Sequence, residues 1–277
     1  MEAIAYAKLN LTLDITGLDE RRYHLLSSVF AEISLADRVA LTPSDKGVTM
    51  TCDDPTLATG EKNLCIRAAN AFLRQFDLTD GFAIHLEKRI PTCAGLGGGS
   101  SDAAAVIKML CEHYSIPTDD PRVLAVARSI GADVPFFLKG GLCHAEGIGD
   151  KLTPLPHRID YVILLVKTNE AASTVDVYRL YDEDAGDCPA TTDAFLNALR
   201  QGVDPAPYIS NQLTLPSSRL CPSVLRLKSD LRALGAVAAE MTGSGSAVFG
   251  LFPDEESART AMNAIKAEFK TICRFVS

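Results

Sequence analysis

The chain has no apolar run of about 18 residues, the length that a membrane-spanning helix needs, so we predict no membrane span and no membrane partner. It has no basic block either, because 27 Lys and Arg are spread against 35 Asp and Glu, for a net charge of −8. That balance argues against general nucleic-acid binding. The chain has 277 residues, of which 47% are hydrophobic and 22% charged, and this composition is typical of a globular protein with a sizeable core.

The eight cysteines contain no C-x-x-C pair, and histidine and cysteine do not cluster at the spacing of metal ligands. We therefore do not expect a zinc cage. The chain is long and shows no secretory leader, so a disulfide framework is not expected either. These patterns predict reduced thiols and a cytoplasmic location.

The first half of the chain alternates between strand and helix patterns. Period-two alternation predicts strands, and apolar residues three and four apart predict helices. The strands are expected at 3–15, 24–51 and 81–88, and two helices at 63–76 and 101–114. A third helix is expected between Asp120, which can cap it, and Gly131, which can close it.

The second half has a different order of elements. Pro154 and Pro156 follow a Gly-rich stretch, and we predict a domain boundary there, with domains at 1–153 and 154–277. Strands are expected at 159–166, 236–241, 247–252 and 272–276, a broken helical region at 173–234, and a helix at 254–269. This β-α-β-β-α-β order is the split pattern of ferredoxin-like domains.

The most informative segment runs from Pro91 to Ala104 and contains four glycines within 95–99. Glycine lets the backbone approach a ligand closely, and the N–H groups at the start of the following helix favour an anion. The pattern therefore indicates a phosphate cradle. It is neither a Walker A loop nor a full dinucleotide fingerprint, because no Gly-Lys-Ser/Thr follows and Ser100 stands at the third glycine position. The alternative is a flexible linker or an elaborate turn.

A second segment of small residues spans 241–247. By itself it is equally well explained by a hairpin turn. Together with the first segment, it could cover one polyphosphate from two sides.

Three further groups are candidates for the chemistry. Lys8 and Asn10 share one face of a strand, which is either a site wall or a solvent-facing surface. Asp133 follows a helix end among apolar residues and could accept a proton, or it could be a turn or capping residue. The neighbours Tyr23 and His24 could hold a base or a sugar, or they could belong to the surface or a partial core.

Three segments, at 7–11, 91–104 and 241–249, resemble in order the motifs of the superfamily named for galactokinase, homoserine kinase, mevalonate kinase and phosphomevalonate kinase (GHMP kinases). This resemblance covers nearly the whole chain. It implies an α+β fold of two domains, one ribosomal-S5-like at the N-terminus and one ferredoxin-like at the C-terminus, with a cleft between them.

Within this superfamily, the chain resembles the kinases that act on a cytidine diphosphate-linked methylerythritol. The residues that carry this resemblance are Lys8 to Leu11, Tyr23-His24, 131–137, Lys167-Thr168, Ser173-Thr174 and 211–213. The resemblance implies ATP-dependent phosphorylation of the substrate's 2-hydroxyl, a step in non-mevalonate isoprenoid precursor biosynthesis. Arg22 stands where these kinases commonly have glycine.

The resemblance also implies roles for individual residues. Asp133 is expected to be the catalytic base and Lys8 its partner. The implied ATP-binding residues are Asn63, Pro91, Ala94, Gly95, Leu96, Gly97, Gly98, Gly99, Ser100 and Ser101. The implied substrate-binding residues are Asn10, Tyr23, His24, Thr174 and Tyr178, with Tyr23 and Tyr178 on the two faces of the cytosine. Mg²⁺ is expected with ATP, and Ser101 is a candidate contact for it. For Asn63, the alternative to a contact with the adenine is a helix cap.

Three other functions compete with this one. The chain could be a homoserine or mevalonate type of kinase from the same superfamily. It could be a nucleotide-binding module without catalysis, which needs no carboxylate beside a lysine. A nicotinamide-dependent oxidoreductase is disfavoured by the missing third glycine. The sequence gives no indication of oligomeric state.

Overall fold

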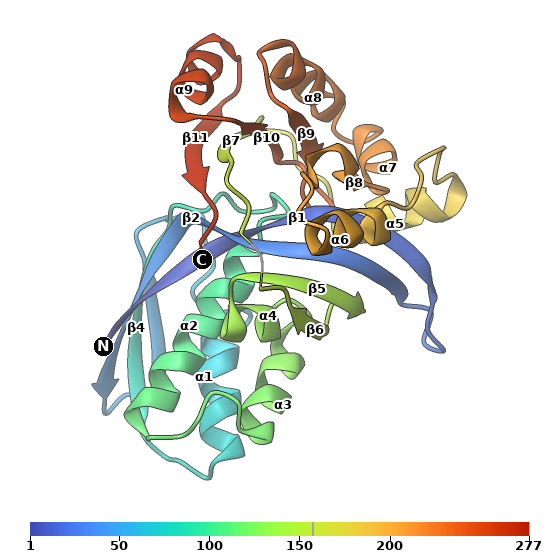
Figure 1. Ribbon diagram of the computed structural model, residues 1–277. Coiled ribbons are helices and arrows are strands. Elements are labelled where there is room, and N and C mark those ends of the chain that lie inside the picture. The colour runs from blue at the N-terminus through green and yellow to red at the C-terminus, as the bar shows by residue number, and fades with distance from the viewer. Residues whose placement is uncertain (157, 277) are drawn as a thin grey trace. The chain divides into compact units, whose positions relative to one another are not determined.

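Figure 1 shows the computed structural model, in which residues 1–156 and 158–276 are described. The chain forms two compact units that interleave along the sequence. The first unit comprises Met1–Ala7, Leu35–Thr92 and Gly97–Gly140, and the second comprises Lys8–Ser34, Cys93–Leu96 and Gly141–Ser277. The division of the chain into domains at 1–153 and 154–277 stays a prediction.

Two long strands, β1 (Glu2–Leu18) and β2 (His24–Ser44), contribute residues to both units. They belong to a seven-stranded sheet with the order β3-β4-β2-β1-β8, in which β5 pairs with β2 and β6 with β5. Strand β4 (Gly81–Glu87) runs antiparallel to β2 and parallel to β3 (Val48–Cys52). The strands predicted at 3–15, 24–51 and 81–88 are thus confirmed.

The first unit contains four helices among its described residues. They are α1 (Leu64–Gln75), α2 (Gly98–His113), α3 (Pro121–Ile130) and α4 (Val134–Lys139). The predicted caps are present, because the Asn63 side chain accepts a hydrogen bond from Cys65 N and the Asp120 side chain accepts one from Arg122 N. Helices α1 and α2 pack side by side, as Figure 1 shows. The short α4 was not predicted.

Helix α2 begins earlier than the sequence predicts. The expected start was residue 101, but the helix starts at Gly98, so Gly98, Gly99 and Ser100 form its first turn. Gly97 precedes it with φ of 69°, a left-handed conformation that glycine adopts without strain. Glycine's low helix propensity hides this turn from a sequence-based prediction.

The second unit adds a hairpin that the sequence did not reveal, formed by β5 (Leu142–Gly147) and β6 (Lys151–Pro154). The Gly-rich stretch here was taken only as a boundary. The helical region predicted at 173–234 is confirmed. It contains α5 (Thr174–Glu183), α6 (Thr192–Arg200), a 3₁₀ turn (Ala206–Tyr208), α7 (Thr214–Ser218) and α8 (Ser223–Ala233). The two-residue strand β8 (Ser210–Asn211) pairs with β1 where this helical region is broken.

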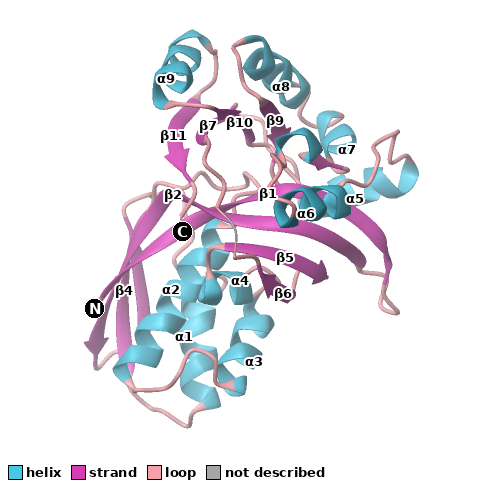
Figure 2. Ribbon diagram, viewed as in Figure 1, coloured by secondary structure: helices cyan, strands magenta, loops and turns pink. Residues whose placement is uncertain are grey.

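A four-stranded antiparallel sheet completes the second unit. Its strands are β7 (Val162–Lys167), β9 (Ala238–Met241), β10 (Val248–Phe252) and β11 (Phe269–Arg274), in the order β11-β7-β10-β9. Helices α8 and α9 (Glu255–Ala264) pack on this sheet and lie on the same face of it, as Figure 2 shows. Leu164, Leu231 and Phe252 lie in the core between them. The predicted β-α-β-β-α-β order is therefore confirmed.

One prediction in this region is wrong. Phe269 was expected on the apolar face of the last helix, but α9 ends at Ala264 and Phe269 begins β11, paired opposite Lys167. Phe269 continues the helical spacing of apolar residues by chance, because the strand that contains it also needs apolar residues.

No helix in the described part of the chain combines the length and hydrophobicity that a membrane span needs.

Candidate active site

The Gly-rich segment is packed by its backbone rather than left flexible. Gly95 has φ of 76°, and a Cβ atom added to it would lie 2.1 Å from the main-chain oxygen of Thr242. From the other side, a Cβ on Gly243 would lie 3.1 Å from Gly95 Cα. The two segments of small residues therefore meet at a distance that only glycine permits. The flexible-linker alternative is wrong for this part of the segment.

Hydrogen bonds fix the same contact. Ala247 N donates to the main-chain oxygen of Ala94 at 3.2 Å, and Thr242 Oγ1 donates to that of Gly95 at 3.3 Å. The turn at 241–247 is itself tied down, because Asn211 Nδ2 donates to the main-chain oxygens of Met241 and Gly243 at 2.9 and 2.8 Å. The hairpin at 241–247 is thus a rigid turn that supports the Gly-rich segment.

Strand β1 brings Lys8 and Asn10 to this junction. Lys8 N donates to the main-chain oxygen of Leu96 at 3.0 Å, and Asn10 N donates to Thr242 Oγ1 at 2.9 Å. The two side chains are joined, with Lys8 Nζ donating to Asn10 Oδ1 at 2.6 Å, and they are 4% and 2% exposed. The solvent-facing alternative is therefore wrong. The backbone of Lys8 therefore contacts the Gly-rich segment, while its buried ammonium group lies beside Asn10 and 4.4 Å from the centre of the Phe30 ring.

Asp133 lies in the first unit, directly before α4. It lies in a turn at the N-cap position of α4, half-buried and without a side-chain capping hydrogen bond, so the turn alternative stays open beside the catalytic one. Two residues earlier, Gly131 packs against the first turn of α2, where a Cβ on it would lie 3.7 Å from Ser100 Oγ. Helices α2 and α4 also pack together. The fold thereby holds a carboxylate close to the helix start that was predicted to hold phosphates.

The start of α1 lies beside the first turn of α2. A Cβ on Gly99 would be 3.5 Å from Leu64 Cδ1, and Asn63, just before Leu64, caps α1 and donates from Nδ2 to the main-chain oxygen of Ala58 at 2.8 Å. Ser101 is buried, with 3% exposure. The contacts of Asn63, Pro91 and Ser101 with a nucleotide or metal ion stay predictions.

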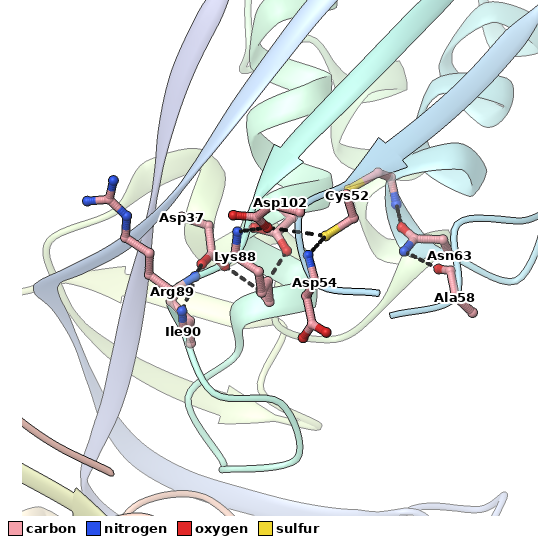
Figure 3. A network of polar contacts seen from close by, with 11 residues as sticks. Asp37, Cys52, Asp54, Ala58, Asn63, Lys88, Arg89, Ile90 and Asp102 are labelled. Carbon is pink, nitrogen blue, oxygen red and sulfur yellow. Dashed lines mark hydrogen bonds and ion pairs between the residues drawn. The ribbon is translucent and has the colours of Figure 1, made fainter. Parts of the chain in front are cut away.

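A charged cluster that the sequence did not reveal lies under α2 (Figure 3). Lys88 Nζ makes ion pairs with Asp37 Oδ2 and, at 2.9 Å, with Asp102 Oδ2. The pKa of Asp102 is raised to about 7 as the net result of burial, which raises it most, the Lys88 charge, which lowers it, and the Asp37 charge, which raises it. The only sign of this cluster in the sequence was Asp102, a carboxylate at the start of an alanine-rich helix.

The predicted substrate residues Tyr23, His24 and Tyr178 come from β2, the turn before it and α5. The rings of His24 and Tyr178 lie 4.6 Å apart at 31°, and His24 Nε2 is 2.7 Å from Asp182 Oδ1. Tyr23 is 60% exposed, with the Arg21 guanidinium 5.4 Å from its ring. His24 and Tyr178 are thus brought together, and Asp182 is a partner that the sequence did not reveal.

Arg22 and Thr174 explain how the aromatic group, formed by Tyr23, His24 and Tyr178, is placed. Arg22 has φ of 64°, a conformation that favours glycine and that matches the glycine commonly found there in the resembling kinases. Thr174 Oγ1 lies 2.8 Å from Ser244 Oγ, which ties the start of α5 to the turn at 241–247. Thr174 therefore links the aromatic group to the Gly-rich junction.

Comparisons with known proteins agree with this geometry. Sequence models of the GHMP kinases match the chain twice, the N-terminal domain at residues 63–141 and the C-terminal domain at 196–271. A relative from Clostridium kluyveri, named 4-diphosphocytidyl-2-C-methyl-D-erythritol kinase, is 33% identical over 270 residues, which cover 97% of this chain and 96% of that protein. The chain belongs to the GHMP kinase family. As a GHMP kinase, it is a phosphotransferase.

Another relative and two solved structures are also similar to this GHMP kinase over most of its length. A relative of the same name from Desulfitobacterium hafniense is 38% identical over 261 residues, covering 93% of this chain and 89% of that protein. A crystal structure of 4-(cytidine 5'-diphospho)-2C-methyl-D-erythritol kinase has a TM-score of 0.80 at 39% identity and covers 95% and 94% of the two chains. A mevalonate kinase structure, with a TM-score of 0.74 at 13% identity and 99% of each chain covered, shares the fold.

The contact between Gly95 and Thr242 gives a direct prediction. Gly95→Ala should lower the free energy of unfolding by more than about 2 kcal/mol, because the new methyl group meets a main-chain oxygen and the residue is left-handed. Gly99→Ala is the matched control. Its nearest neighbour is a flexible leucine at 3.5 Å and it lies in a helix, so its stability should hold or rise. Urea unfolding followed by circular dichroism measures both, and equal stabilities would contradict the prediction.

Proposed function

We propose that this GHMP kinase transfers the γ-phosphoryl group of ATP to the 2-hydroxyl of 4-diphosphocytidyl-2-C-methyl-D-erythritol. The observation that carries the proposal is the junction of Gly95, Thr242 and Lys8, which joins three segments distant in sequence through main-chain contacts, with the Lys8 side chain buried. Relatives with the name of that kinase, 33% and 38% identical over nearly the whole chain, support the choice of substrate.

The Gly-rich segment suits the phosphates of ATP. The first turn of α2 leaves main-chain N–H groups without helical partners, and the helix dipole favours negative charge there. Gly98 and Gly99 have no side chains that would cover these groups. ATP, when bound, supplies the phosphoryl group that is transferred. Residues 95–101 would hold its phosphates in place, mainly by main-chain donors; Ser101 N already donates to the main-chain oxygen of Gly97 at 2.9 Å, so Ser101 would contribute through its hydroxyl.

Mg²⁺ fits the site through the nucleotide rather than through a protein cage. Among residues 1–156 and 158–276, no group of three or more His, Cys, Asp or Glu side chains could hold a metal ion. Mg²⁺ commonly binds through phosphates and few protein ligands, and it neutralises phosphate charge when bound. Ser101, in the first turn of α2, stays the candidate protein contact.

Asp133 and Lys8 would provide the chemistry. As the substrate oxygen bonds to the γ-phosphorus and the bond to the β–γ bridging oxygen breaks, Asp133 would take the hydroxyl proton. Lys8, held by Asn10 Oδ1 at 2.6 Å, would offset the negative charge at the attacking oxygen and orient Asp133. Phosphoryl transfer depends mainly on positioning and electrostatics, so these two groups and the N–H donors suffice.

The aromatic group would select the substrate. Tyr23 and Tyr178 would stack on the cytosine, and His24 would form hydrogen bonds with its edge. Asp182 holds the His24 ring at 2.7 Å and thereby decides which ring nitrogen faces the base. Asn10 and Thr174 would contact the remainder of the substrate. A small hydroxy acid needs no such stacking surface.

The substrate assignment is tested directly with a panel. The protein with ATP and Mg²⁺ should phosphorylate the cytidylyl compound and should not turn over homoserine or mevalonate. The homoserine and mevalonate kinases that share the fold are 13–19% identical to this chain and give no support for their substrates. Turnover of either small acid, without turnover of the cytidylyl compound, would contradict the proposal. Nucleotide binding without any turnover would favour a binding module.

Loss of the proposed base should remove catalysis while leaving binding intact. Asp133→Asn keeps the shape of the side chain but cannot take the proton, so kcat should fall by at least about a hundredfold. The Kd for an ATP analogue, measured by calorimetry, should change little. An unchanged kcat would remove Asp133 from the mechanism.

The aromatic group should affect substrate binding rather than the chemical step. Tyr178→Ala should raise KM for the cytidylyl substrate by about tenfold or more, because a stacked base contributes about 1–3 kcal/mol. Tyr178→Phe keeps the ring and should leave KM close to that of the wild type. Steady-state kinetics at saturating ATP separates KM from kcat. Equal KM values for the alanine and phenylalanine variants would show that Tyr178 does not stack on the base.

A further inference from the structure

The buried Lys8 ammonium group begins a chain of hydrogen bonds between β1 and β2 that the proposed chemistry does not yet use. Lys8 Nζ donates to Asn10 Oδ1 at 2.6 Å, and Asn10 Nδ2 donates to Ser28 Oγ at 2.9 Å. Ser28 Oγ in turn donates to the main-chain oxygen of Thr12. The four residues are between 0% and 4% exposed, so bulk water does not readily replace a lost partner.

The alternation of the two strands brings these groups together. Lys8, Asn10 and Thr12 are two residues apart on β1 and share one face of it. Ser28 and Phe30 likewise share one face of β2. The two strands are neighbours in the sheet, as Figure 1 shows, and all five residues belong to the second unit. Strands hold side chains more precisely than loops do, so the arrangement suits a site that needs exact positions.

The chain of hydrogen bonds has a direction, because two of its groups can play only one role. An ammonium group donates and cannot accept, so Lys8 requires the oxygen of the Asn10 amide. A main-chain oxygen accepts and cannot donate, so the one hydroxyl proton of Ser28 is used on Thr12. Ser28 Oγ must then accept, and it requires the nitrogen of the Asn10 amide. Both ends of the chain therefore specify the same orientation of that amide.

The acceptor at the end of this chain is held firmly. Thr12 Oγ1 accepts hydrogen bonds from Val29 N at 3.1 Å and from Thr192 Oγ1 at 2.9 Å. The backbone of Thr12 also pairs with Ser210 of β8. The main-chain oxygen that takes the Ser28 proton is thus fixed in the sheet.

The Phe30 ring gives the ammonium group a second contact from β2. Lys8 Nζ lies 4.4 Å from the centre of the ring, within the range of a cation–π interaction. The ring is itself buried, and a Cβ added to Gly149 would lie 3.6 Å from its Cζ, so it has little room to move. With the Asn10 oxygen and the ring both fixed, the directions of the Lys8 N–H groups are set.

We propose that Ser28 is a positioning residue for phosphoryl transfer, because it fixes the Asn10 amide that directs the Lys8 ammonium group. This inference rests on the proposed function, since it takes Lys8 as the group that offsets charge at the attacking oxygen. Ser28 is 0% exposed and acts through Asn10. Without its hydroxyl, the amide nitrogen loses its partner, the amide can turn, and the ammonium group loses its fixed direction. An error of about 1 Å in the position of such a group costs about a hundredfold in rate.

Replacement of Ser28 tests the inference through the rate of the chemical step. Ser28→Ala should lower the single-turnover rate of phosphoryl transfer by at least about tenfold, because small errors of position are this costly. Single turnover isolates the chemistry from product release. The Kd of Mg-ADP, measured by calorimetry, should change by less than about twofold, because the hydrogen bonds of Ser28 go to Asn10 and Thr12 rather than to the Gly-rich segment.

Two further substitutions separate the hydrogen bond from the volume of the side chain. Ser28→Thr keeps the hydroxyl but adds a methyl group at a fully buried position, so it should lower Tm and keep the rate within about threefold of the wild type. Ser28→Cys offers only a weak donor and acceptor, so its rate should fall as far as that of the alanine variant. Well below Tm, a merely structural role would leave all three rates equal to that of the wild type.

Ser27→Ala is the matched control. Ser27 is the neighbour of Ser28 on the opposite face of β2, and its hydroxyl lies 2.9 Å from His144 Nε2. The variant loses one hydroxyl and one hydrogen bond of similar length, and its rate should equal that of the wild type. If Ser28→Ala does not fold, the comparison of the threonine and cysteine variants takes its place. Phe30→Leu, which removes the ring and keeps an apolar side chain, should lower the rate by about fivefold or more.

The outcomes separate this inference from the proposed function. Transfer by Ser28→Ala or Ser28→Cys at the rate of Ser27→Ala would overturn the inference and leave the kinase function intact. Equal losses in the Ser27 and Ser28 variants, or a loss of Mg-ADP affinity as large as the loss of rate, would also overturn it. If the wild type phosphorylates another alcohol of the panel, the substrate assignment fails and the same variants are compared with that alcohol. Absence of transfer to any alcohol would overturn both.

Discussion

The contact between the Gly95 backbone and the main-chain oxygen of Thr242 is the constraint on which the candidate site depends. No residue with a Cβ atom fits at 2.1 Å from that oxygen, so the chain can close only with glycine there. Lys8 N bonds to Leu96 beside it, and Asn10 N bonds to Thr242 from the same strand. The glycines of this segment therefore serve close packing first, and access of a ligand to main-chain donors follows from it.

A second constraint lies under the helix that follows the segment. Burying Asp37, Lys88 and Asp102 together costs desolvation energy, and well-packed apolar residues often serve stability as well or better. Two main-chain N–H groups donate to Asp37 and offset part of that cost. A Cβ added to Gly98 would lie 3.0 Å from Lys88 Nζ, so the cluster packs against the first turn of α2 and leaves no room for a side chain there.

Local patterns in the sequence were sufficient to predict much of the fold. Alternation identified β1 and β4, apolar spacing identified α1, and the cap at Asp120 identified the start of α3, because each signal lies within a few neighbouring residues. The ferredoxin-like order followed from the sequence of elements alone. Helix α2 was placed three residues too late, since glycine hides a helical turn that tertiary packing enforces.

The site was less predictable where partners are distant in sequence. Lys88 is separated from Asp37 by 51 residues, and His24 from Asp182 by 158. No periodicity connects such pairs, so a charged residue in a strand end or a helix gives no sign of its partner. The Gly-rich segment and the pairing of Lys8 with Asn10 were accessible because glycine runs and strand alternation act over short spans. Asp133 was a candidate from its place after a helix end among apolar residues, but its role as the catalytic base came only from the resemblance to a family.

The interleaving of the two units along the chain has a consequence for synthesis on the ribosome. Residues 8–34 belong to a unit whose other main segment runs from Gly141 to the end, and its strand β11 occupies 269–274. In the growing polypeptide, β1 can pair with β2 early, but its other sheet neighbour, β8, and the core residues that pack on Leu13 emerge only after residue 160. A nascent chain of this design is a natural client for chaperones that shield exposed strands.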